Sequence, residues 1–265
     1  MPCNRRESGF TLVELSIVIV IVGLLVGGIL IGKDMIRSAE VRSVIKDIET
    51  YRTAVYTFKN KYNCLPGDCP NATSYFGAQD PVPATCQITA STGNLTCDGD
   101  GNGTVSNTSV AGSEYEMFRF WQHLAIAELI KGQYTGVSGS LGANQHLLGV
   151  NAPTAAIPNS GFSFFYRVCF GCAATTLYNN NYGNAFLYSA QGAVPSNATP
   201  SGDVFTPAEA MAVDQKIDDG RPGKGLVIAR GRSACTTSVN ASDYEGDYKT
   251  SVSTIVCALF IKTGL

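Results

Sequence analysis

The sequence predicts an α+β fold in which one long N-terminal helix packs on an antiparallel β-sheet, with loop-rich, disulfide-bonded insertions. Three observations support this. An apolar run at 10–31, FTLVELSIVIVIVGLLVGGILI, continues into an amphipathic pattern. Segments rich in aromatic and β-branched residues recur in the second half. Eight cysteines follow residue 63 in neighbouring pairs.

The composition favours an exported domain over a cytosolic enzyme. Only 15% of the 265 residues are charged, 28 are glycine, and the net charge is -2. Such a chain has room for one domain or two small ones and suits a loop-rich extracellular structure. Without a basic excess, nucleic-acid binding has no electrostatic support.

The first helical element is expected to cross a membrane. A short polar segment, 1–9, carries Arg5 and Arg6 ahead of the apolar run. As a helix, the run spans about 33 Å, enough for the ~30 Å hydrocarbon core. Basic residues before the run favour a cytoplasmic N-terminus. An ordinary secretory signal would instead have a shorter apolar core followed by a small-residue cleavage site.

One carboxylate interrupts this run. Glu14 would cost roughly 2.5–3.5 kcal/mol in a bilayer, and the sequence suggests no partner nearby in the same helix. Cleavage between Gly9 and Phe10 would create one, because the new α-amino group would be positive and Glu14 would be the fifth residue. The alternative is a charge tolerated near the helix end.

These residues carry a family resemblance. The stretch GFTLVEL at 9–15 resembles the class III leader junction of type IV pilins and type II secretion pseudopilins. The resemblance implies a pilin-like fold and a prepilin peptidase that cuts after Gly9 and methylates Phe10. It implies that Glu14 meets the amine of a neighbouring pilin or pseudopilin subunit during assembly. It also implies an ATPase motor and an inner-membrane assembly platform as partners.

The resemblance extends beyond the leader but is not complete. Blocks at 65–77, 120–125 and 214–225 are similar to blocks in a subset of pilin-like proteins. Many pilins have a proline at the position of Ile31, whereas this chain has four glycines around it: Gly23, Gly27, Gly28 and Gly32. Glycine costs a helix about 1 kcal/mol relative to alanine. The glycines suit either close helix packing or local melting on assembly.

The helix is expected to continue as an amphipathic stem. One apolar stripe recurs at spacings of three and four: Val44, Ile48, Tyr51, Val55, Phe58 and Tyr62. Leu65-Pro66-Gly67 ends the helix. The predicted organisation is therefore a leader at 1–9, a transmembrane and assembly helix at 10–32, a stem at 33–63 and a globular periplasmic or extracellular domain at 64–265.

The globular domain should hold two more helices and four strands. The first helix is predicted at 113–131, with Gly132 as its stop and His123 as a polar or packing residue. Thr206-Pro207-Ala208-Glu209 is a capping box that starts a helix ending near Ile217. Strands are predicted at 162–168, 185–189, 226–229 and 254–261.

The cysteines read as four disulfides. Neighbours in sequence are expected to pair: Cys64 with Cys69, Cys86 with Cys97, Cys169 with Cys172, and Cys235 with Cys257. The sequence alone does not determine the connectivity, since eight cysteines allow 105 pairings. Cys3 would leave with the leader. The CxxC at 169–172 lacks a βαβ setting, so a structural bond is favoured over a redox one.

The best candidate metal site resembles the first half of an EF-hand-type calcium loop. Asp98, Asp100 and Asn102 place oxygens at alternate positions before Gly103, and Thr104 offers its carbonyl. The twelfth position is Ser109, so Glu114 or Glu116 would have to supply the last carboxylate. The alternative is a turn without metal. A second group, Asp214, Asp218 and Asp219, is read as a helix end and turn rather than a cation site.

The resemblance implies a filament subunit, and no motif in the sequence indicates an enzyme. Neither histidine lies in HExxH, and no GxSxG motif occurs. We expect a structural subunit of a type IV pilus or type II secretion pseudopilus, held in the inner membrane before assembly and in a periplasmic or extracellular filament afterwards. The alternative is a minor tip subunit with an adhesin-like or substrate-binding domain, because 265 minus 9 leaves 256 residues, large for a bulk pilin. Pilus, secretion and DNA-uptake machines remain alternatives.

Overall fold

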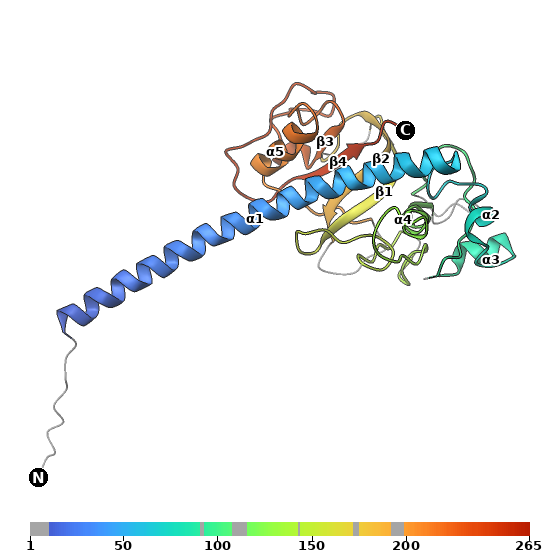
Figure 1. Cartoon of the computed structure of the whole chain (residues 1–265). Helices are drawn as coiled ribbons and strands as arrows, with labels where there is room; N and C mark the ends of the chain where they lie inside the picture. Colours follow the sequence, from blue (N-terminus) through green and yellow to red (C-terminus); the bar gives the residue numbers. More distant parts are fainter. Residues whose placement is uncertain (1–10, 91–92, 108–115, 143, 172–174, 192–198) are drawn as a thin grey trace, which may run out of the picture.

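The computed structural model describes the chain except residues 1–10, 91–92, 108–115, 143, 172–174 and 192–198. Its main feature is a single helix, α1, at Leu12–Tyr62. The predicted continuity from the apolar run into the stem is confirmed. The helix ends at Asn63, whose φ of 57° is left-handed and whose N–H bonds to the Lys59 carbonyl. Figure 1 shows the second half of α1 lying along the globular domain and the first half extending away from it.

The sheet has four strands in the order β1-β2-β4-β3, with every neighbouring pair antiparallel. The strands are β1 (Ser160–Cys169), β2 (Asn180–Ala190), β3 (Val227–Arg230) and β4 (Ala258–Lys262). All four predicted strands are present. β4 starts later than predicted because the chain before it bonds elsewhere: Cys257 exchanges backbone hydrogen bonds with Phe205 and forms a disulfide with Cys235.

Aromatic side chains join α1 to the sheet. The Tyr51 ring on α1 lies 5.2 Å from Trp121 and 5.1 Å from Phe162, centroid to centroid. Phe120 stacks on Phe164 at 3.7 Å. Such pairs contribute about 0.5–1.5 kcal/mol each beyond area burial. The core therefore forms between the α1 stem, the sheet and α4 (Glu116–Ile126), which carries Phe120 and Trp121.

The helix α4 ends earlier than the sequence predicts. The helix ends at Ile126 rather than Lys131, and its predicted start at 113–115 lies outside the described residues. Glu128 takes a left-handed φ of 60°, its N–H bonds to the Ala125 carbonyl, and the Leu129 N–H bonds to the Leu124 carbonyl. This is a Schellman motif closed by a glutamate. The prediction was wrong because it placed the stop at the next glycine, Gly132.

The remaining elements are short, and disulfides tie several of them. They are α2 (Ala72–Phe76), α3 (Pro83–Ile88), α5 (Pro207–Ile217) and α6 (Arg232–Cys235). The capping box of α5 is present as predicted, between Thr206 and Glu209. Three predicted disulfides are formed: Cys64–Cys69, Cys86–Cys97 and Cys235–Cys257. The fourth predicted pair includes Cys172, which lies outside the described residues.

Candidate assembly helix and acidic cluster

The first half of α1 is exposed to solvent in this structure. Its large apolar side chains are exposed, from Leu12 at 86% to Ile36 at 63%. A side chain built at any of the four glycines, 23, 27, 28 or 32, would have open space around it. The helix is also long and apolar enough to cross a membrane. Across the described residues, nothing in the chain's own domain covers this half.

Glu14 has a partner in its own helix. The Thr11 N–H and the Thr11 Oγ1 hydroxyl each donate to Glu14 Oε2 at 2.8 Å, and the Glu14 N–H donates to Thr11 Oγ1 at 3.2 Å. The expectation that no partner lay nearby was wrong, since Thr11-Leu12-Val13-Glu14 is itself a capping-box pattern. Gly9 and Phe10, the predicted processing residues, lie outside the described residues.

A long-range ion pair fixes the point where α1 meets the domain. Arg37 Nε donates to Glu209 Oε1 at 2.6 Å, and Nη2 donates to Glu209 Oε2 at 3.0 Å and to the Val204 carbonyl at 2.6 Å. Glu209 also caps α5 through the Thr206 N–H at 2.9 Å. Sequence reasoning found the cap but missed Arg37, because the pair spans 172 residues.

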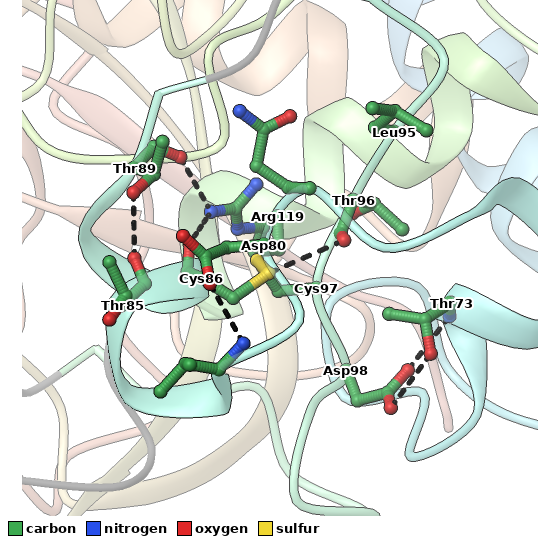
Figure 2. The surroundings of a disulfide bond; sticks show 12 residues. Thr73, Asp80, Thr85, Cys86, Thr89, Leu95, Thr96, Cys97, Asp98 and Arg119 are labelled. Carbon is green, nitrogen blue, oxygen red and sulfur yellow. Dashed lines mark hydrogen bonds between the residues drawn. A yellow bond between two sulfur atoms is a disulfide. The ribbon is translucent and has the colours of Figure 1, made fainter.

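Three carboxylates from three segments converge at the start of α4, whose first residue is Glu116. Oxygen atoms of Asp68, Asp100 and Glu116 lie within 4.8 Å of one another, and we call these three residues the acidic cluster. Asp98, expected in the same site, faces α2 instead: its carboxylate accepts from the Thr73 N–H at 2.8 Å and from Thr73 Oγ1 at 3.0 Å. Figure 2 shows this pair beside the Cys86–Cys97 bond.

The loop around the acidic cluster is held by its own backbone. Asp68 Oδ1 and Oδ2 accept from the N–H groups of Asn102 at 3.0 Å and Gly103 at 2.9 Å. Asn102 Oδ1 in turn accepts from the Thr104 N–H at 2.7 Å. Glu116 accepts from the Asp100 N–H at 3.2 Å. Asp68, Asp100, Asn102 and Glu116 are therefore in one network, and Asp68 is the member that sequence spacing did not indicate.

The acidic cluster is electrostatically unfavourable as it stands. Burial, followed by the neighbouring Asp100, raises the pKa of Asp68 to about 7 against the opposing backbone N–H groups. Burial likewise raises the pKa of Glu116 to about 7. Among the described residues, no lysine or arginine forms an ion pair with these carboxylates. A hard cation that prefers oxygen ligands would relieve both the burial cost and the mutual repulsion.

The second acidic group serves a helix end and turn, as predicted. Asp214 is buried and accepts from the Tyr248 hydroxyl at 2.9 Å and from the Gly220 N–H at 3.2 Å. Asp218 caps α5 and accepts from the Leu226 N–H, and Asp219 accepts from the Arg221 N–H at 2.8 Å. These three carboxylates also lie within 4.8 Å of one another.

His123 is a packing residue, as predicted. Its Nδ1 accepts from the Gly67 N–H at 2.9 Å, and its Nε2 faces Thr96 Oγ1 at 2.9 Å and the Cys97 carbonyl at 3.2 Å. Burial lowers its pKa to about 3, so it stays neutral. The adjacent buried Arg119 donates to the Cys86 and Thr89 carbonyls, as Figure 2 shows.

Comparison with known proteins identifies one segment. Residues 4–30 match the family model of the prokaryotic N-terminal methylation motif, which is the prepilin signature of type IV pilins and pseudopilins. The match covers the predicted processing junction, Glu14 and most of the apolar half of α1. No curated protein sequence and no solved structure matched the chain.

Proposed function

We propose that this chain is a structural subunit of a type IV pilus or type II secretion pseudopilus. One observation carries the proposal: the prepilin signature at 4–30 runs directly into a helix whose apolar half its own domain leaves uncovered. A surface of this size needs a membrane before assembly and other apolar helices afterwards. Prepilin peptidase, other pilin or pseudopilin subunits and an inner-membrane platform are the partners this function requires.

The mature N-terminus tests processing. Mass spectrometry of filaments from cells that contain the peptidase should find N-methylated Phe10 as the first residue. A Gly9→Leu variant should remain uncleaved, accumulate in the membrane and be absent from filaments. Assembled material that begins at Met1 would refute the proposal.

The capping box allows a sharper test of Glu14. Glutamine at the same position can still accept from Thr11 and complete the box, but it lacks the charge. If Glu14 acts by pairing with a neighbouring amine, Glu14→Gln should be cleaved yet enter filaments poorly. Thr11→Ala, which loses the cap and keeps the charge, should assemble better than Glu14→Gln. The reverse order would show that capping, not charge, is what assembly needs.

A tip subunit is the second candidate. It is favoured by apolar side chains displayed on loops of the domain, such as Phe170 at 69% exposure and Val239 at 84%. Exposed aromatic residues such as Phe170 are frequent in binding surfaces. Immunogold labelling would place a structural subunit along the shaft and a tip subunit only at filament ends.

We further propose that the acidic cluster binds calcium. The residues fit, because Asp68, Asp100 and Glu116 offer carboxylate oxygens within 4.8 Å of one another and Asn102 lies beside them. Calcium should raise the melting temperature, and a chelator should lower it. Asp68→Asn should abolish this shift, whereas the control Asp98→Asn should retain it because Asp98 faces α2. A shift that survives in Asp68→Asn would refute the assignment.

A further inference from the structure

A groove lies between α1 and α5, next to the part of α1 that enters the membrane in the proposed function. Its walls are one face of each helix: Ser38, Val41, Arg42 and Ile45 from α1, and Ala208, Ala212 and Lys216 from α5. The two alanines are one helical turn apart, and their small side chains keep the groove open. Its volume is about 600 Å³. The Arg37–Glu209 pair also lines the groove.

The charges on the groove walls are of two kinds. Arg37 is neutralised, since Glu209 and Glu40 both accept from its guanidinium group. Arg42 and Lys216 are exposed and make no ion pair or side-chain hydrogen bond within the described part of the chain. Between these two cations the lining is mostly apolar. The groove therefore has an apolar floor, formed by Val41, Ile45, Ala208 and Ala212, and two unpaired positive charges at its edges, Arg42 and Lys216.

The position of the groove along α1 suggests what it meets. Met35 and Ile36 are exposed at 69% and 63%, so the bare apolar surface reaches residue 36. At 1.5 Å per residue, Arg42 lies about 9 Å beyond that point and about 15 Å beyond Gly32, where the predicted transmembrane helix ends. Its long side chain would therefore have to reach back along α1 toward the lipid headgroup layer. Basic residues are normally depleted on the non-cytoplasmic side of a membrane helix. Arg42 nevertheless lies on that side and is unpaired within the described part of the chain, in a stretch that also holds Lys33, Asp34 and Glu40.

We propose that the α1/α5 groove binds the headgroup of an anionic phospholipid in the leaflet from which α1 emerges. The phosphate would lie between Arg42 and Lys216, and the glycerol and first acyl carbons would cover the apolar floor. An apolar helix from a second copy fits less well, because it would bury both cations without a partner. The proposal rests on the proposed function only in requiring α1 to be in a membrane.

The test compares lipids of one size and different charge. The full chain is purified in mixed micelles of phosphatidylglycerol and phosphatidylcholine, and the lipids retained are counted by native mass spectrometry. We expect a preference for phosphatidylglycerol. The double variant Arg42→Gln with Lys216→Gln should reduce that preference about 30-fold, or roughly fivefold for each cation removed. The control Lys59→Gln with Lys131→Gln removes two exposed cations outside the groove and should leave it unchanged.

Hydrogen exchange in nanodiscs locates the site. Amides of α5 should be better protected with phosphatidylglycerol than with phosphatidylcholine alone, and inorganic phosphate without lipid should give no such protection. An equal preference for phosphatidylglycerol in the wild type and the groove variant would overturn the proposal. Protection of α5 by free phosphate alone would overturn the proposal in favour of a soluble anion. Protection of α5 that appears only in filaments would overturn it in favour of a second copy of the chain. If the chain preferred phosphatidylglycerol as expected but failed to form filaments, the lipid proposal would be supported and the proposed filament function would be refuted.

Discussion

Replacing Asp214 with asparagine should make the folding stability much less dependent on pH. Asp214 is completely buried at the end of α5, where its carboxylate accepts from the Tyr248 hydroxyl and the Gly220 N–H. Burial raises its pKa from 3.8 to about 7. Asparagine has nearly the same shape, can still bond to both partners and does not ionise.

The sign and size follow from this raised pKa. A group whose pKa is higher in the folded state stabilises the fold at low pH and loses that contribution as the pH rises. For Asp214 the loss should begin near pH 4 and be complete above about pH 7. At 1.36 kcal/mol per pKa unit, the total is on the order of 4 kcal/mol. The variant should therefore be the more stable protein at pH 8.

Urea unfolding of the full chain in detergent micelles, followed by tryptophan fluorescence between pH 4.5 and 8.5, measures this difference. A chelator keeps cations away from the acidic cluster, whose own raised pKa values add to the slope of both proteins. Asp243→Asn makes the same substitution at a carboxylate that accepts from the Val239 N–H in a turn, and it is the matched control. If Asp214→Asn ran parallel to the wild type, the reasoning from burial would be refuted.

Three further changes test the packing. The double variant Cys235→Ser with Cys257→Ser opens a loop of 22 residues and should lower the free energy of unfolding by about 3 kcal/mol, measured under non-reducing conditions. Trp121→Ala empties a fully buried site in the core and should cost about 3–5 kcal/mol. Because Trp121 is the only tryptophan of the sequence, the urea unfolding of this variant and of the wild type is followed by circular dichroism. Arg37→Gln and Glu209→Gln should show a coupling of about 1 kcal/mol in a double-mutant cycle, since the pair is only partly buried; purely additive effects would mean that it does not hold α1 to α5.

Local patterns predicted most of the fold. The continuous α1, the four strands and the α5 capping box all depend on residues that are close in sequence, where periodicity and turn chemistry act directly. The stop of α4 was misplaced because Glu128, rather than a glycine, adopts the left-handed conformation. β4 starts late because Cys257 bonds to Phe205 and Cys235, which sequence spacing does not reveal.

The candidate sites likewise divide into those formed by neighbouring residues, which the sequence predicts, and those formed by residues far apart, which it does not. The prepilin signature is a contiguous motif, so the sequence was enough to find it. The acidic cluster is assembled from segments that are far apart. Asp68 belongs to the acidic cluster because its carboxylate accepts from the Asn102 and Gly103 N–H groups. Asp98 does not, because its carboxylate accepts from the Thr73 N–H at the start of α2. The Arg37–Glu209 pair and the groove beside it depend in the same way on how α5 docks against α1.

The strand order has a consequence for the making of this protein. β4 (Ala258–Lys262) follows β2 and β3 in sequence but lies between them in the sheet, so it leaves the ribosome after both of its neighbours. Until it arrives, β3 has no partner in the sheet and one edge of β2 is open. The N-terminal helix can thus enter a membrane long before the domain can close. A variant that lacks residues 258–262 would therefore have a split sheet.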